Sequence, residues 1–290
     1  MADFMQFVFA GLTTGAIYAL AALGFSLIYN ASGVINFAQG DFLMLGGMVG
    51  AALLAINLPY GLAIAGAIAA TVVVGLLLYR FAIKPAGDAS VVSLIIITIG
   101  ASIFIQGVVQ VTLGKNQHVL PPFSGDAALR IAGAYVLPQS LWMFGVAALM
   151  VAACALFFRF TLLGKAMLAV AANKLAAQAV GIPATRILQL SFGLSALLGS
   201  IAGVVAAPIT TTVYDIGLML GMKGFVAATL GGLGSGTGAV VGGLLVGLLE
   251  ALFAGYVSSA YKDAAPFVLI IVILLVMPHG LFGAKVTDRV

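Results

Sequence analysis

The sequence is poor in charge and nearly free of cysteine. Of its 290 residues, 7% are charged and 63% are hydrophobic, whereas a soluble domain has about 25% charged residues. Such a composition cannot cover a water-soluble surface, so we expect an integral membrane protein in contact with lipid. The formal net charge of +4 is spread over many loops and does not indicate a nucleic-acid partner. Cys154 is the only cysteine, which excludes an internal disulfide and predicts a buried, inert thiol.

Patterns of catalytic and metal-ligating residues are also missing. The two histidines, His118 and His279, lie at the ends of apolar segments, and neither accompanies a plausible nucleophile. The eight acidic residues form no cluster, and no HExxH motif occurs. We therefore expect no catalytic residue, no metal site and no cofactor bound by this chain, which argues against a membrane enzyme.

Long apolar runs are what the sequence does contain. Many are close to the roughly 20 residues that a helix needs to cross a bilayer, and they lack the alternation of barrel strands. The prediction is an all-α, polytopic transmembrane helical bundle, a single domain over residues 1–290 with eight to nine membrane segments. The predicted helices are 4–29, 42–56, 59–81, 91–113, 141–158, 187–207, 239–254 and 266–277. Residues 217–230 either cross or re-enter the membrane. Motifs of the GxxxG type, such as Gly11–Gly15 and Gly243–Gly247, predict close helix packing.

The basic residues set an orientation. No Lys or Arg precedes the first apolar run, so we expect it to be kept as a membrane helix that begins outside. The 80–84 loop, the 159–186 loop and the tail with Lys285 and Arg289 are the more basic connections and are placed inside. Lys115, Arg130 and Lys262 then lie outside, and Lys223 stays undecided. Nine crossings satisfy this arrangement; eight would put the tail outside.

The stretch of residues 159–186 is the most polar connection on the predicted inner side. It contains Arg159, Lys165, Lys174 and Arg186. We predict a helix from Lys165 to Val180 that ends at Gly181 and cannot continue through Pro183. Such a helix is too polar to span the membrane, so we expect it to fit a groove on another protein. Its low-bulk face consists of Leu168, Ala171, Ala172, Leu175 and Ala179.

Two further stretches allow more than one interpretation. Residues 36–41 are polar for a membrane setting, and we expect irregular backbone that enters the membrane and lines a cavity. Asp41 either lines a pathway or caps the next helix, and Glu250 is expected to face a partner subunit rather than a substrate. The glycine-rich run 231–238 lacks the Gly-Lys-Ser/Thr of a phosphate loop, so it predicts a tight turn or close packing.

Several motifs together resemble one family. They are Gly33–Gly47 (GVINFAQGDFLMLGG), Gly164–Met167 (GKAM), Ala179–Ile182 (AVGI), Ala202–Pro208 (AGVVAAP) and Leu230–Ser235 (LGGLGS). The chain resembles, over nearly its whole length, the LivH-type membrane permeases of bacterial ABC importers for branched-chain amino acids. The resemblance implies a multi-pass protein of the bacterial inner membrane without covalent chemistry. The implied partners are a second related permease, two cytoplasmic ATPase subunits that use ATP and Mg, and a periplasmic substrate-binding protein.

The resemblance also implies roles for particular residues. The ATPase-coupling segment would comprise Gly164, Lys165, Met167, Leu168, Ala171, Asn173, Lys174, Ala177, Gly181 and Ile182. Many importer permeases have Glu-Ala-Ala followed by Gly here; this chain has Ala176, Ala177 and Gly181 but no Glu. The expected pathway residues for a zwitterion with an apolar side chain are Asn36, Gln39 and Asp41.

Two other hypotheses about the function stay open. A permease of the same group could carry urea, short amides or another small solute. A stand-alone secondary transporter would need broken helices with buried carboxylates, often in paired halves, and no clear internal repeat is visible in the sequence.

Overall fold

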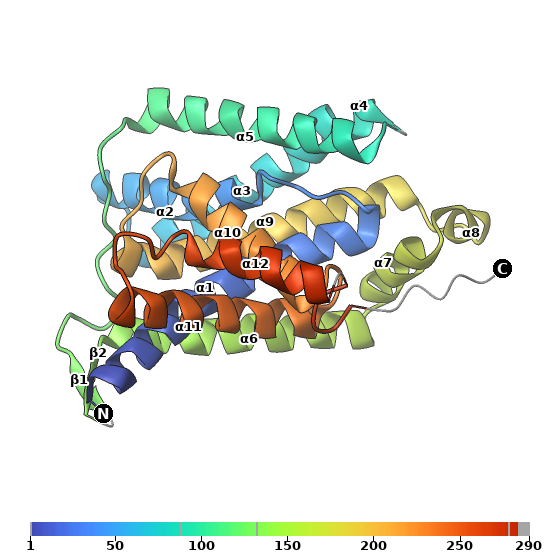
Figure 1. The fold of residues 1–290 in the computed structure, drawn as a ribbon. Coiled ribbons are helices and arrows are strands. Elements are labelled where there is room, and N and C mark those ends of the chain that lie inside the picture. Colours follow the sequence, from blue (N-terminus) through green and yellow to red (C-terminus); the bar gives the residue numbers. More distant parts are fainter. Residues whose placement is uncertain (1, 88, 132, 278, 284–290) are drawn as a thin grey trace.

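The computed structural model describes residues 2–87, 89–131, 133–277 and 279–283. It is a bundle of helices that run between two ends (Figure 1), which confirms an all-α, polytopic architecture. Six helical runs in this part of the chain are long and apolar enough to cross a membrane. They are α1 (Ala2–Ser32), α3 to α4 (Tyr60–Ala86), α5 (Val91–Leu113), α6 (Pro138–Phe160), α9 (Ala184–Thr210) and α11 (Gly236–Tyr256).

Four shorter apolar helices complete the bundle. They are α2 (Gln39–Ala55), α7 (Leu162–Ala172), α10 (Ile216–Gly231) and α12 (Ala265–Val276). Their lengths of 17, 11, 16 and 12 residues fall below the roughly 20 residues of a full crossing. Length and composition therefore support six spans, and the predicted count of eight to nine is not confirmed.

Helix boundaries follow the local signals in most places. The predicted helix 91–113 is α5 without change, and the Ser90 side chain accepts a hydrogen bond from the Ser93 amide as its N-cap. Beyond α3 (Tyr60–Leu78), the chain continues through a π-helical turn, η1 (Tyr79–Ile83), into α4 (Lys84–Ala86). The predicted end of the helix 187–207, directly before Pro208, is wrong. Proline in a last turn removes one hydrogen bond and leaves the remaining ones, so α9 runs on to Thr210.

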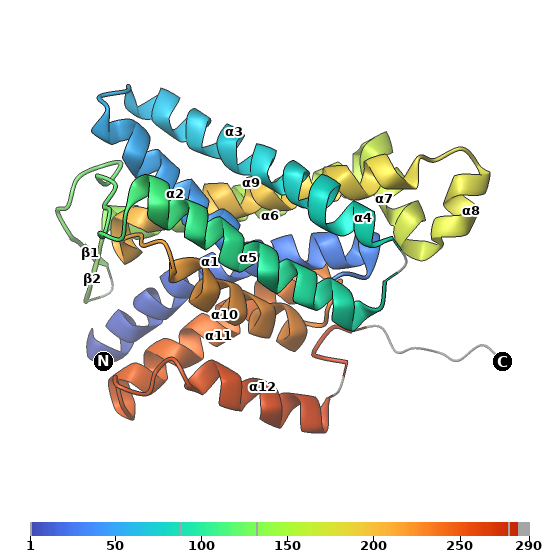
Figure 2. The same cartoon turned by 90° about the horizontal axis from the view of Figure 1, so that it is seen from above.

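The two ends of the bundle differ in structure (Figures 1 and 2). One end holds the N-terminus and an unpredicted antiparallel hairpin of β1 (Leu129–Ile131) and β2 (Ala134–Val136). The Gln6 side chain bonds to the backbone amide and carbonyl of Tyr135 at 2.8 and 2.9 Å, which fixes this hairpin against α1. The opposite end carries α4, α7 and α8 (Lys174–Ala179).

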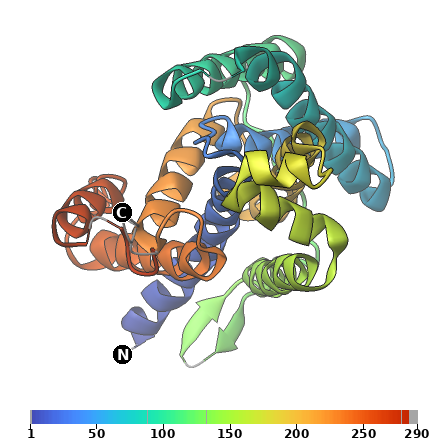
Figure 3. The same cartoon turned by 90° about the vertical axis from the view of Figure 1, so that its right-hand side faces the viewer.

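Glycine allows α1 to lie at the centre of the bundle (Figure 3). A methyl group on Gly247 of α11 would overlap the backbone of Gly15, and one on Gly243 would overlap the backbone of Ala19. Backbones therefore approach closely along α1 and α11, as the GxxxG pairs predict. The tight turn predicted in the glycine-rich run is confirmed, because Gly232 and Gly234, at φ +100° and +89°, reverse the chain between α10 and α11.

Candidate translocation site and coupling segment

The predicted pathway residues lie on a short interruption inside the bundle. Helix α1 ends at Ser32, and the backbone is irregular until α2 begins at Gln39. The predicted start of this helix at residue 42 is therefore three residues late. Asn36, Gln39 and Asp41 are each 0% exposed. The polar stretch is thus enclosed by protein, the setting in which irregular backbone is tolerated at membrane depth.

Gln39 connects three helices. The Ser195 hydroxyl of α9 donates to the Gln39 Oε1 and also lies 2.9 Å from the Gly24 carbonyl oxygen of α1. The Gln39 Nε2 lies 3.4 Å from the Ser195 carbonyl oxygen. Both the oxygen and the nitrogen of the Gln39 side-chain amide therefore make contacts, and these contacts hold α2 in position against α9 and, through Ser195, against α1.

Asp41 and Asn36 each keep one polar atom free. The Gln106 Nε2 of α5 donates to the Asp41 Oδ1 at 2.9 Å, and the Asn36 Oδ1 accepts from the Ala38 amide at 3.2 Å. Among the described residues, the Asp41 Oδ2 and the Asn36 Nδ2 have no hydrogen-bond partner. The capping interpretation of Asp41 is wrong, because Ala38 is the N-cap of α2 and has no side-chain bond.

Helix α10 closes the other side of this segment. A methyl group on Gly40 would overlap the carbonyl oxygen of Gly217, and one on Gly217 would come within 2.7 Å of the Asp41 Oδ1. Two glycines are therefore required for α10 to approach α2 so closely. Asp41, a residue of α2, is consequently in contact with both α10 and α5.

A buried charge cluster that the sequence did not reveal lies between α1, α10 and α11. The Lys223 Nζ is 2.8 Å from the Glu250 Oε1 and also pairs with the Asp263 Oδ1. The Tyr18 hydroxyl donates to the Glu250 Oε2 at 2.9 Å. Lys223 is 3% exposed and Glu250 7%, so Glu250 does not face a partner subunit as expected. The hydrogen bond from the Lys223 ammonium lowers the pKa of Asp263, which lies in the loop before α12. The sequence could have predicted this pair, because Lys223 and Glu250 each lie within an apolar helix and buried charges are usually paired.

The predicted coupling helix is two helices. The backbone is extended at Asn173 (φ −161°, ψ 106°), whose side chain caps α8 by accepting from the Ala176 amide at 2.9 Å. A continuous helix over residues 165–180 is therefore wrong, because asparagine competes for backbone donors and favours a cap. The predicted end is confirmed: Gly181 has φ +87°.

Burial divides the coupling residues into two groups. Six are exposed: Lys165, Leu168, Ala171, Asn173, Lys174 and Gly181. Gly164, Met167 and Ala177 are buried, and Ile182 is partly buried. A methyl group on Gly164 would overlap the backbone of Phe157, so the buried members hold the segment on the bundle. All five residues of the predicted low-bulk face are exposed, and Leu175 is 77% exposed.

A basic cleft of about 710 Å³ lies beside α8. Its basic side chains are Arg80, Lys84 and Arg186, and none of its described lining residues is acidic. Together with Lys165 and Lys174, they make this end of the bundle positively charged. No three His, Cys, Asp or Glu side chains in the described ranges come together as a metal site.

These features define a class of protein: a multi-pass membrane transport protein with a polar interior segment and an exposed helical pair at its basic end. The family can be stated as well. The chain belongs to the permease components of branched-chain amino acid transport systems, whose family model matches residues 7–277. It is therefore a multi-pass inner-membrane protein.

Individual relatives cover the chain almost completely. It is 36% identical over 303 residues to the high-affinity branched-chain amino acid transport system permease protein LivH of Escherichia coli K12, with 99% of this chain and 98% of LivH covered. BraD of Pseudomonas aeruginosa is 31% identical with the same coverage. The ribose import permease RbsC of Escherichia coli K12 is 26% identical over 90% of this chain and 82% of its own. The solved structure of PsaBC from Streptococcus pneumoniae in complex with Fab matches in fold, with a TM-score of 0.52, 16% identity and 94% and 90% coverage.

Proposed function

We propose that this chain is the non-catalytic membrane subunit of an ATP-driven importer that moves leucine, isoleucine and valine inward. The observation that carries this proposal is the 36% identity to LivH, a permease of high-affinity branched-chain amino acid transport, over 99% of the chain. Residues 1–290 would form one permease domain. A second related permease would complete the membrane part, and a periplasmic binding protein would deliver the substrate.

The energy would enter through the segment of residues 159–186. Two ATPase subunits would dock there and bind ATP and Mg, while this chain binds no cofactor. The support is that Leu168 on α7 and Leu175 on α8 are exposed, as are Lys165 and Lys174 on the same two helices, and that the basic cleft borders α8. Exposed large apolar side chains together with basic ones are typical of a protein–protein contact.

Nine membrane segments fit this orientation best. Helices α9 and α11 run in one direction between the two ends of the bundle, and α12 runs in the other (Figures 1 and 2). Helices α2 and α10 would be short segments shielded by neighbours, and α12, whose Val268, Ile271 and Leu275 are exposed, would be a short segment in contact with lipid. The tail residues Lys285 and Arg289, placed inside by the charge rule, lie outside the described residues.

Cysteine labelling in intact cells tests the orientation. In a Cys154→Ala background, an impermeant thiol reagent is expected to label Lys262→Cys from outside. Lys262 is exposed in the connection between α11 and α12, which lies at the same end of the bundle as the N-terminus (Figure 1). Lys174→Cys is expected to react only in opened membranes. Labelling of Lys174→Cys in sealed cells would reverse the orientation and remove the coupling assignment.

Asn36, Gln39 and Asp41 would line the pathway, since buried polar groups are costly inside a membrane and mark transport routes. The second candidate function is import of another small solute by the same mechanism. The similarity to a ribose permease at 26% identity favours this over a stand-alone secondary transporter.

Reconstituted uptake tests the function. Liposomes containing both permeases and the ATPases are expected to accumulate labelled leucine when ATP is enclosed and binding protein is outside. Unlabelled isoleucine and valine should compete, whereas urea and ribose should not. Competition by urea or ribose alone would favour the second candidate, and uptake without ATPases would contradict both.

A further inference from the structure

Helix α5 carries a polar stripe that faces the pathway segment. Thr98, Ser102 and Gln106 follow each other at intervals of four, which places them on one side of the helix. The Phe37 amide donates to the Thr98 Oγ1 at 3.2 Å. At the other end of the stripe, Gln106 donates to Asp41 at 2.9 Å and to the Ser102 Oγ at 3.1 Å. These bonds form a seam between α5 and residues 36–41.

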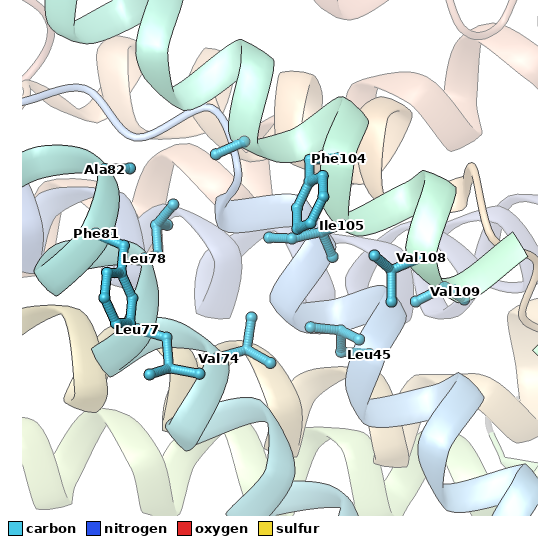
Figure 4. A pocket seen from close by; sticks show the side chains of 11 residues that line it. Leu45, Val74, Leu77, Leu78, Phe81, Ala82, Phe104, Ile105, Val108 and Val109 are labelled. Carbon is cyan, nitrogen blue, oxygen red and sulfur yellow. The ribbon is translucent and has the colours of Figure 1, made fainter. Parts of the chain in front are cut away.

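The apolar packing of α5 beside this seam is incomplete. Figure 4 shows a groove of about 350 Å³ between α5, α3 and α2. Its described lining is entirely apolar: Leu45, Val74, Leu77, Leu78, Phe81, Ala82, Ala101, Phe104, Ile105, Val108 and Val109. Because few apolar contacts join α5 to α3 here, separating them costs less than opening a packed interface.

The groove begins about one helical turn from Asp41 and Gln106. Leu45 lies four residues after Asp41 on α2, and Val109 lies three residues after Gln106 on α5, so these two groove residues are each about one helical turn from a residue of the seam. The seam thus combines an unpartnered carboxylate oxygen on Asp41 and an unpartnered amide donor on Asn36, both side chains 0% exposed, with an apolar space.

We propose that this seam is the substrate site, built for the zwitterionic head and branched side chain of an aliphatic α-amino acid. The α-ammonium group donates to the Asp41 Oδ2, and the α-carboxylate accepts from the Asn36 Nδ2. The side chain enters the groove at Leu45, Ile105 and Val109. A buried polar atom without a partner in a native protein requires an explanation, and an amino acid supplies one donor group and one acceptor group.

The buried Lys223–Glu250 pair does not meet these requirements. Each of its side chains is already bonded, and Glu250 also accepts from Tyr18. The seam differs because the Asp41 Oδ2 is open to a cationic ammonium group, whose hydrogen bond to a carboxylate is stronger than the one that the neutral Gln106 donates to the Oδ1.

This inference rests on the proposed function, and the reconstituted importer tests it. Asp41→Asn is expected to lower leucine uptake by about tenfold or more, because a charge-assisted hydrogen bond is lost, and Asp41→Glu should recover part of the uptake. Ser200→Ala is the matched control, since Ser200 is also buried with an unpartnered oxygen but lies outside the seam. If the Asp41→Asn variant takes up leucine as fast as the wild type, the site is refuted. If the wild type itself takes up no leucine, the proposed function is refuted.

A second variant tests whether the substrate side chain enters the groove. Val109, 4% exposed, can be replaced by phenylalanine to fill the space. Val109→Phe is expected to lower leucine uptake more than valine uptake, by up to about tenfold in the ratio, since one methylene discriminates by that order. A general folding defect would lower both equally. An unchanged ratio would therefore overturn the placement of the side chain.

Discussion

Replacing Lys223 by methionine is expected to lower the free energy of unfolding by about 3–5 kcal/mol, because it leaves a buried carboxylate without its counter-charge. Glu250 is 7% exposed and, among the described residues, would keep the hydrogen bond from Tyr18 alone. The pair joins α10 to α11, and Tyr18 adds α1. The loss would therefore loosen the central helices of the bundle together.

Thermal unfolding of the purified protein in detergent measures this effect. Lys262→Met is the matched control, because Lys262 is exposed at the same end. Asp263→Asn should cost much less than Lys223→Met, because the Asp263 side chain is 48% exposed and screened by solvent. The double variant Lys223→Met with Glu250→Gln should regain most of the stability, since no unpaired charge remains. A Lys223→Met protein as stable as Lys262→Met would mean that the pair contributes nothing.

Replacing Leu175 by glutamate is expected to reduce leucine uptake about a hundredfold. Leu175 is 77% exposed on α8, where the ATPase is proposed to dock, and a charge buried there without a partner would cost about 3 kcal/mol. Leu175→Met keeps an apolar side chain of similar volume and should retain uptake. Uptake in cells, together with co-purification of the ATPases, distinguishes lost docking from lost folding. Normal uptake by Leu175→Glu would remove Leu175 from the contact.

Much of the fold could be predicted from the sequence because the bilayer leaves few alternatives. Apolar run length located all the long helices, and α5 was predicted without error because Ser90 and Gly114 mark its ends. The count of crossings could not be predicted, since α2 and α10 are shorter than a bilayer and need their neighbours. The break at Asn173 was missed because the Ala- and Leu-rich surroundings predict a continuous helix, and one cap overrides that preference.

The candidate site was predicted only in part. Enclosure of Asn36, Gln39 and Asp41 followed from polar residues amid apolar runs, whereas their partners did not. Gln106 is 65 residues from Asp41 and Ser195 is 156 residues from Gln39, and no local pattern connects positions so far apart. Lys223 and Glu250 could have been paired by the rule that buried charges occur together, but Asp263 lies in a loop and gave no signal.

The account depends on energy entering through the segment of residues 159–186. The most direct measurement is the number of leucine molecules imported per ATP hydrolysed, in the same vesicles, for the wild type and for a variant with Lys165→Glu, Lys174→Glu and Leu175→Glu. We predict that the variant imports almost no leucine and that substrate no longer stimulates its ATP hydrolysis. An unchanged ratio of import to hydrolysis in the variant would contradict the account.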